Sequence, residues 1–105
     1  MELTINKIVE GNKVTLNLKG MLDITTANVI DPFLDEVNDI DTLIIDFSNL
    51  EFIDSTGIGA IMNAIFLSNE KNFKLKLQGE DELTKEVLET VGLYDILTAM
   101  QGEVE

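Results

Sequence analysis

The chain has 105 residues, 20 of them acidic and 7 basic, which gives a formal net charge of -13 at pH 7. This length predicts one domain, residues 1–105, and the 45% of apolar residues are enough for a core. The charge argues against nucleic acid and anionic membranes as partners, because both would repel the chain, and it favours basic surfaces of other proteins.

The missing residue types narrow the chemistry further. The chain has no histidine, cysteine or arginine. A Ser-His-Asp triad, a thiol nucleophile, a thiolate metal site and a bidentate arginine clamp on phosphate are therefore excluded. We predict a binding protein and not an enzyme. We also expect a cytoplasmic location, because the start of the chain does not resemble a signal peptide and no apolar run approaches membrane-spanning length.

Two alternating segments predict an N-terminal β-hairpin. Residues 3–9 form the first strand, and residues 13–19 alternate without a fault. Gly11-Asn12 suits the two-residue turn between them. One face of the second strand is apolar and should be buried, through Val14, Leu16 and Leu18.

A helix is predicted over about residues 26–38, where apolar residues recur at helical spacing. Thr25-Thr26 offers an N-cap. Pro32 leaves two alternatives, because it can begin a helix at the first helical position or kink one that began near Thr26. We favour one helix with a disturbed first half.

A central strand and an unusually apolar helix follow. Residues 42–47 form a continuous, β-branched run, and Ser48-Asn49 is expected to turn the chain. The helix over residues 58–67 is apolar almost all the way round, whereas a helix on a sheet needs one apolar stripe. The surplus should face either the C-terminal helix or a partner protein. It consists of Ile58, Met62, Ile65 and Phe66.

The C-terminal third predicts a strand over residues 73–77 and two helices. Acidic residues 80–82 suit the first turn of a helix, and Gly92 suits its C-terminal cap. A short helix over 94–100 and a frayed acidic tail over 101–105 complete the chain. The inner face of the first helix is expected to contain Leu83, Val87, Leu88 and Val91. The order of elements predicts an α/β class, with a mixed sheet of about four to five strands and helices packed on it.

The turn before the apolar helix concentrates polar chemistry in residues 54–59. A helix start collects free backbone N–H groups, which favours an anionic group there. Ser55 or Thr56 could serve merely as the N-cap, and Asp23 and Asp54 as capping or solvated carboxylates. The two glycines fit a tight turn and close backbone approach better than a nucleotide site, because a lone Gly-x-Gly is a weak phosphate signal.

The run Phe52-Ile53-Asp54-Ser55-Thr56-Gly57-Ile58-Gly59 resembles the signature of STAS domains, the family of bacterial anti-sigma factor antagonists and sulfate transporter tails. Three further runs resemble family motifs, so the resemblance covers the length of the chain. They are Gly20-Met21-Leu22-Asp23, Asp46-Phe47-Ser48-Asn49-Leu50 and Val91-Gly92-Leu93. A single bare domain resembles the antagonist branch. The resemblance implies a STAS-type fold.

The resemblance also implies a protein-binding switch that regulates transcription indirectly. In that branch, the unphosphorylated antagonist binds an anti-sigma factor that is also a serine kinase, and sigma factor is released. The kinase uses ATP bound to itself to phosphorylate the serine that matches Ser55, and a PP2C-type phosphatase resets it. The chain itself then needs no cofactor and no metal. The residues beside the switch, which would meet the partner, are Asp23, Asp54, Thr56, Gly57, Ile58, Gly59 and Met62.

Two other hypotheses remain open. The first is a STAS scaffold or lipid-transport accessory subunit in which Ser55 is never phosphorylated. The second is a receiver-like enzyme phosphorylated on Asp46, which follows an apolar strand. A receiver would want a pair of acidic residues after its first strand, and the segment Leu3 to Glu10 offers no such pair.

Overall fold

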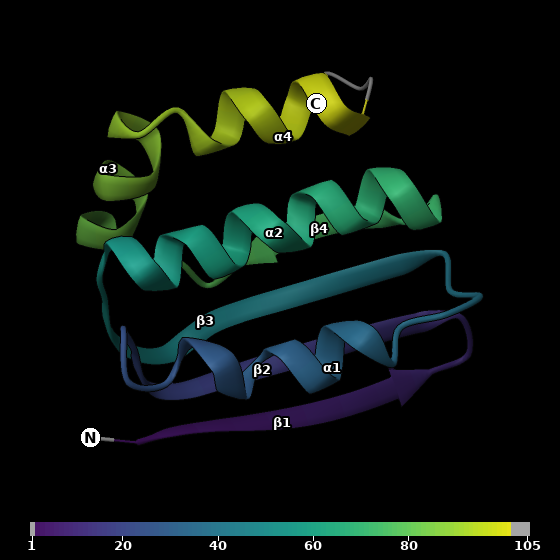
Figure 1. The fold of residues 1–105 in the computed structure, drawn as a ribbon, viewed down its shortest axis with the longest axis horizontal. Coiled ribbons are helices and arrows are strands. Elements are labelled where there is room, and N and C mark those ends of the chain that lie inside the picture. The colour runs from purple at the N-terminus through teal and green to yellow at the C-terminus, as the bar shows by residue number, and fades with distance from the viewer. Residues whose placement is uncertain (1, 102–105) are drawn as a thin grey trace.

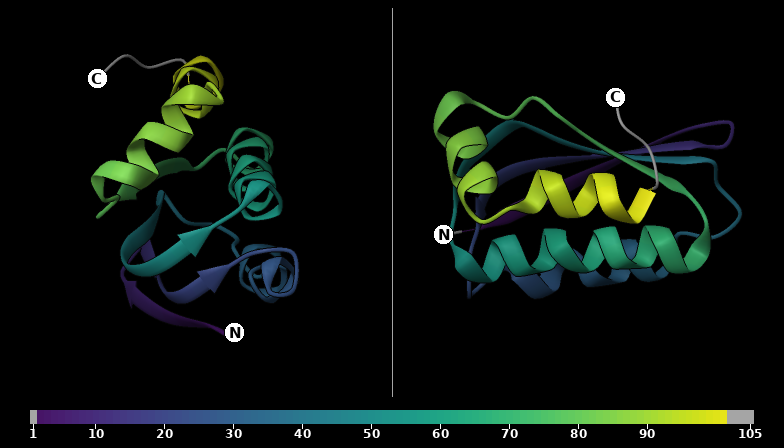
Figure 2. Two further views of the ribbon diagram at one scale, coloured as in Figure 1. Left: turned by 90° about the vertical axis from the view of Figure 1, so that its left-hand side faces the viewer. Right: turned by 90° about the horizontal axis from the view of Figure 1, so that it is seen from above.

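The computed structural model describes residues 2–101, and within them a four-stranded mixed sheet carries helices on one face (Figures 1 and 2). This agrees with the predicted α/β class. Gln101 is the last residue of a helix and not part of a frayed tail. The rest of the predicted tail, residues 102–105, lies outside the described residues.

The hairpin is confirmed. β1 (Leu3–Glu10) and β2 (Lys13–Leu22) pair antiparallel. The apolar positions of β2 face the helices because side chains alternate across a strand, and this face is buried. The opposite face of the sheet has no helix over it in the described part of the chain (Figure 2).

The predicted turn at Ser48-Asn49 is wrong, because β3 (Thr42–Ile53) runs through it as one strand. β3 pairs parallel to β2, with register shifts that give β3 one extra residue between Asp46 and Asn49 and another between Leu50 and Phe52. At the first shift, Asp46 Oδ1 accepts hydrogen bonds from Ser48 N at 2.9 Å and Ser48 Oγ at 2.6 Å. Ser48-Asn49 thus belongs to a bulge within β3, and a bulge changes the direction of a strand without ending it.

The single helix predicted over residues 26–38 is also wrong. The structure has a 3₁₀ turn, η1 (Ala27–Val29), and a separate short helix, α1 (Asp31–Asp35), with Pro32 in its first turn. Proline has no N–H to give to a preceding turn, so it begins α1 and does not kink a longer helix. Thr26 does not cap η1 with its side chain.

Four elements complete the fold: α2 (Ser55–Lys71), β4 (Lys74–Gln78), α3 (Glu82–Thr90) and α4 (Leu93–Gln101). β4 pairs parallel to β3, so the strand order is β1-β2-β3-β4. Gly92 joins α3 to α4 with φ of 79°, as expected of a C-terminal cap, and Leu93 beside it is fully buried.

The surplus apolar face of α2 is divided between the core and the solvent. α4 lies along α2 (Figure 2, right), and Ile65 is fully buried. Phe66 remains 47% exposed. The inner face predicted for α3 is partly wrong, because Leu88 is buried whereas Leu83 is 70% exposed. α3 packs chiefly against α4 at one end of the molecule, so a single stripe of this short helix is covered (Figure 1).

No helix among the described residues is both long enough and apolar enough to cross a membrane.

Candidate functional site

The polar turn predicted from the sequence lies where β3 ends and α2 begins. Asp54 adopts an extended backbone and its Oδ1 accepts a hydrogen bond from Gly57 N at 2.9 Å, so Asp54 is the N-cap of α2. Neither Ser55 nor Thr56 caps the helix. Ser55 is the first residue of α2 and is exposed, which leaves its hydroxyl open to a partner.

The second carboxylate oxygen of Asp54 binds a neighbouring loop. Ile24 N donates to Asp54 Oδ2 at 3.2 Å, and Asp54 N donates to Leu22 O at 3.2 Å. One aspartate therefore joins the start of α2 to the loop that follows β2. This is how Asp23 and Asp54, which are far apart in sequence, come to lie on facing segments.

Asp23 organises the loop after β2. Its Oδ1 accepts hydrogen bonds from Thr25 Oγ1 at 2.7 Å and Thr25 N at 2.9 Å, while Asp23 N donates to Thr26 Oγ1 at 2.9 Å. The hydrogen bond from the Thr25 hydroxyl, followed by that from its amide, holds the pKa of the Asp23 carboxyl below its usual value. Thr26 is buried and donates to Met21 O at 2.7 Å, so it anchors this loop and does not cap a helix.

The two glycines of the turn have different environments. Gly57 is buried, and a Cβ on it would collide with Leu22 O and lie 2.9 Å from Ile53 Cγ1. Gly57 therefore lets α2 pack closely on the strands, and its contact with a partner stays a prediction. Gly59 is exposed, with open space where a Cβ would be. Close approach inside the protein explains Gly57 and does not explain Gly59.

An exposed stripe runs along α2 from Ser55. Its members recur at helical spacing, and Ile58 and Met62 lie half-buried beside it. The stripe consists of Ser55, Gly59, Asn63 and Phe66. Sequence reasoning missed one neighbour of this surface, Ile24, which is 75% exposed. The available signal was a lone apolar residue within the polar run Asp23-Ile24-Thr25-Thr26.

Asp46 lies in β3 on the open face of the sheet and not at the end of the strand. Besides its two bonds from Ser48, its Oδ2 accepts from Gln78 Nε2 at 3.2 Å. Partial burial acts to raise the pKa of Asp46, but the bonds from Ser48 and Gln78 outweigh it, and the pKa is below its usual value. Residues 2–101 contain no group of three or more histidine, cysteine or acidic residues that could hold a metal ion. The receiver-like hypothesis finds no support here, because the carboxylate is occupied by structural hydrogen bonds.

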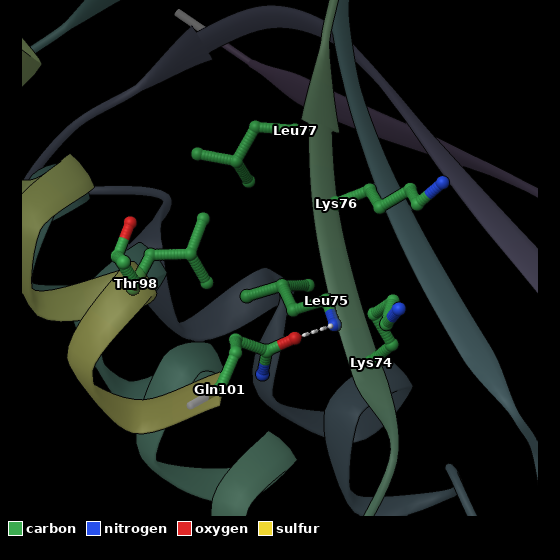
Figure 3. Close-up of a pocket in the computed structure, with 7 residues that line it drawn as sticks. Lys74, Leu75, Lys76, Leu77, Thr98 and Gln101 are labelled. Carbon is green, nitrogen blue, oxygen red and sulfur yellow. Dashed lines mark hydrogen bonds between the residues drawn. The ribbon is translucent and has the colours of Figure 1, made fainter. Parts of the chain in front are cut away.

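A hollow of about 410 Å³ lies between β4 and α4, lined in part by Leu75, Leu77 and Thr98 (Figure 3). Gln101 closes one end of it: its Oε1 accepts from Leu75 N at 3.1 Å, and its Nε2 donates to Ser68 Oγ at 2.9 Å. Ser68 is 13 residues along α2 from Ser55, or roughly 20 Å at the rise of an α-helix. The hollow is thus separate from the polar turn.

The sequence of this chain is similar to a known domain family and to known proteins over nearly its whole length. The sequence model of the STAS domain matches residues 4–105. The anti-sigma F factor antagonist of Paenibacillus polymyxa is 25% identical over 107 residues, covering 99% of this chain and 92% of that protein. The anti-sigma-B factor antagonist of Staphylococcus aureus is 24% identical over 108 residues, covering both chains completely.

Solved structures show the same fold. The Bacillus cell fate determinant SpoIIAA in its phosphorylated form matches with a TM-score of 0.69 at 21% identity, covering 89% of this chain and 86% of that one. A sulfate transporter family protein from Wolinella succinogenes matches with a TM-score of 0.77 at 19% identity, covering 90% and 79%. At these identities the likeness concerns architecture.

Proposed function

The chain belongs to the STAS domain family, and we propose that it is an anti-sigma factor antagonist whose binding is switched off by phosphorylation of Ser55. The names of the P. polymyxa and S. aureus relatives, which span the same length, support the first part. They also agree with the prediction that the chain binds other proteins and is not an enzyme. The single observation that supports the second part is that Asp54, and not Ser55, caps α2, which leaves the Ser55 hydroxyl exposed.

The position of Ser55 suits a switch that leaves the fold intact. A phosphoryl group adds about -1.5 to -2 charge at pH 7. Because Ser55 is the first residue of α2, this charge lies at the positive end of the helix dipole and is tolerated there. Because Ser55 is exposed, the group also needs no internal space.

The same phosphoryl group is unfavourable to a docked partner. It adds charge and bulk beside the carboxylates of Asp54 and Asp23, on a surface that a partner must desolvate. Basic groups of the partner that are positioned to pair with the two carboxylates would not be positioned to pair with the added phosphate. A loss of about 3 kcal/mol in binding is roughly a hundredfold in affinity, which is enough to change partners.

The partners are those that the resemblance to anti-sigma factor antagonists implies. The unphosphorylated chain binds an anti-sigma factor with serine kinase activity, whose own bound ATP supplies the phosphate, and a PP2C-type phosphatase restores the binding form. The chain contributes a docking surface and a phosphoacceptor and needs no cofactor of its own. It acts in the cytoplasm, where transcription is regulated through release of sigma factor.

The test is to incubate the purified chain with candidate anti-sigma kinases and ATP, and to measure its intact mass. We expect a gain of one phosphoryl group that is abolished in Ser55→Ala and retained in Thr56→Ala, the neighbouring exposed hydroxyl. Retention of the gain in Ser55→Ala would contradict the proposal. No gain with any kinase that binds the chain would favour the non-phosphorylated scaffold.

A binding measurement completes the test. Ser55→Asp should bind the anti-sigma factor roughly a hundredfold more weakly than the wild type, while Ser55→Ala binds and cannot be switched off. Both variants should keep the thermal transition of the wild type, because Ser55 is exposed and does not cap the helix. Equal affinities of Ser55→Asp and wild type would rule out an electrostatic switch.

A further inference from the structure

We infer that Ile24 is an apolar anchor of the docking surface, and that it enters an apolar pocket with a basic rim on the partner that binds around Ser55. This inference rests on the proposed function and adds a residue to its surface. Ile24 is 75% exposed, more than any other large apolar side chain of the described residues. It lies in the loop after β2, whose amide Ile24 N is bonded to the N-cap of α2.

Hydrogen bonds on both sides hold the backbone at Ile24. Asp23 N donates to Thr26 Oγ1 at 2.9 Å, and Thr25 N donates to Asp23 Oδ1 at 2.9 Å. Thr26 N and Ala27 N both donate to Asp23 O, at 3.0 and 2.8 Å. The loop is therefore ordered before any partner arrives. A side chain on a pre-ordered backbone needs less additional ordering of the loop on binding than one on a mobile loop.

Asp54 makes Ile24 and Ser55 parts of one rigid unit. Its Oδ2 accepts from Ile24 N, its Oδ1 accepts from Gly57 N, and Ser55 is the next residue in the chain. A partner that covers Ser55 therefore also meets Ile24. This continuity with the Ser55 surface is the reason to assign the anti-sigma kinase, and not a second copy of the chain, as the occupant.

The surroundings of Ile24 define the chemistry of the pocket. Asp23 precedes Ile24 in the chain, Asp54 accepts a hydrogen bond from Ile24 N, and the chain as a whole carries a net charge of -13. A second copy would bring the same charges to the contact and repel. An apolar pocket rimmed by lysine or arginine would bury Ile24 and pair with the carboxylates, which is the arrangement of a central anchor inside a polar rim.

The test compares Ile24 with Val9, a second β-branched residue that is 60% exposed. Val9 pairs with Val14 near the start of β2, eight residues from Leu22 at its other end, so it lies roughly 25 Å from the Ser55 surface at the rise of a strand. We would measure the affinity of Ile24→Ala, Ile24→Asp and Val9→Ala for the anti-sigma kinase that binds the wild type. The thermal transition of each variant is the control for folding.

We expect Ile24→Ala to weaken binding by roughly tenfold or more and Ile24→Asp to weaken it further, with Val9→Ala within about twofold of wild type. Ile24→Ala should raise the kinase's KM for the chain and leave kcat for Ser55 phosphorylation unchanged. Wild-type affinity in Ile24→Asp would overturn the inference and leave the proposed function standing. Wild-type chain that binds no anti-sigma kinase would overturn both.

Discussion

The backbone of Gly57 lies directly against the carbonyl oxygen of Leu22, so closely that a Cβ at position 57 has no room. This contact brings the first turn of α2 onto the end of β2. It also fixes the distance between the segment that carries Ser55 and the loop that carries Asp23 and Ile24. The geometry of the candidate site thus depends on a buried glycine.

Gly57→Ala should therefore lower the free energy of unfolding, by about 1–3 kcal/mol, because the added methyl group forces α2 away from Leu22 and Ile53. Urea unfolding measures the change. Gly59→Ala is the matched control, two residues along the same helix, where a Cβ meets open space. It should stabilise the chain by up to about 1 kcal/mol, since alanine is the better helix former. Equal stabilisation by both substitutions would show that helix propensity, and not packing on Leu22, decides the outcome.

Gly59→Ala also tests the docking surface. Gly59 weakens the helix, and no contact inside the protein requires a glycine at this position. Close approach of a partner's backbone is a reason for a glycine there. We expect this variant to be more stable than wild type and to bind the anti-sigma factor more weakly. Unchanged binding in a titration would remove Gly59 from the surface while leaving Ser55 in place.

Substitution can distinguish the roles of the two hydrogen bonds that the carboxylate of Asp54 accepts, from Gly57 N and from Ile24 N. Asp54→Ala loses both, and the loss of the N-cap should cost about 0.5–2 kcal/mol of stability. Asp54→Asn keeps one side-chain oxygen, so it can cap Gly57 N and cannot also accept from Ile24 N in the same geometry. We expect near wild-type stability for Asp54→Asn by urea unfolding, with faster amide hydrogen exchange at Ile24. Slow exchange at Ile24 in both variants would show that the Asp54 bond does not hold the loop.

Much of this fold could be predicted from local patterns. Strict alternation identified β2, and the glycine at position 92 marked the end of α3, because these signals depend on a few neighbouring residues. The central strand was predicted too short, since Ser48-Asn49 has the composition of a turn. The role of Ser48-Asn49 as a bulge depends on the pairing of β3 with β2 and on the carboxylate of Asp46, and these contacts cannot be read from local sequence.

For the candidate site, the sequence predicted where the residues lie in the chain's fold but not which structural role each of them has. Asp54, Ser55 and Asp23 lie where the turn and the resemblance put them. Which of them caps α2 could not be decided from sequence, because aspartate, serine and threonine all serve as caps. Ile24 was missed because its exposure follows from the hydrogen bonds within the loop, which the sequence does not reveal. An isolated apolar residue in a polar run also forms no periodic pattern that would mark it.

Asp46 should make the stability of the chain depend on pH. Its pKa is below the ordinary value in the folded state, so the carboxylate stabilises the fold above the unfolded pKa of about 3.9, and this contribution is lost as the pH falls through the folded pKa. Asp46→Asn should lower the free energy of unfolding at pH 7 by about 1 kcal/mol, which is below the usual range for a hydrogen bond to a charged group because Asp46 is partly solvated. The difference should shrink below about pH 4. Asp35→Asn, an exposed carboxylate of α1, is the control. A deficit that stays constant from pH 7 to pH 3 would mean that the charge of Asp46 is not the stabilising feature.

Gln101 should protect the free edge of the sheet. β4 is an edge strand, and an unpaired edge amide can pair with another chain. Gln101 satisfies Leu75 N with its carbonyl (Figure 3) and the buried Ser68 hydroxyl with its amide, so Gln101→Ala leaves both without that partner. We expect a loss of about 1–3 kcal/mol in urea unfolding and faster amide exchange at Leu75. Thr98→Ala, which also lines the hollow and is exposed, should change neither. Wild-type exchange at Leu75 in Gln101→Ala would show that water replaces the side chain without loss. Faster exchange together with concentration-dependent association would show that this one carboxamide keeps β4 from pairing with a second chain.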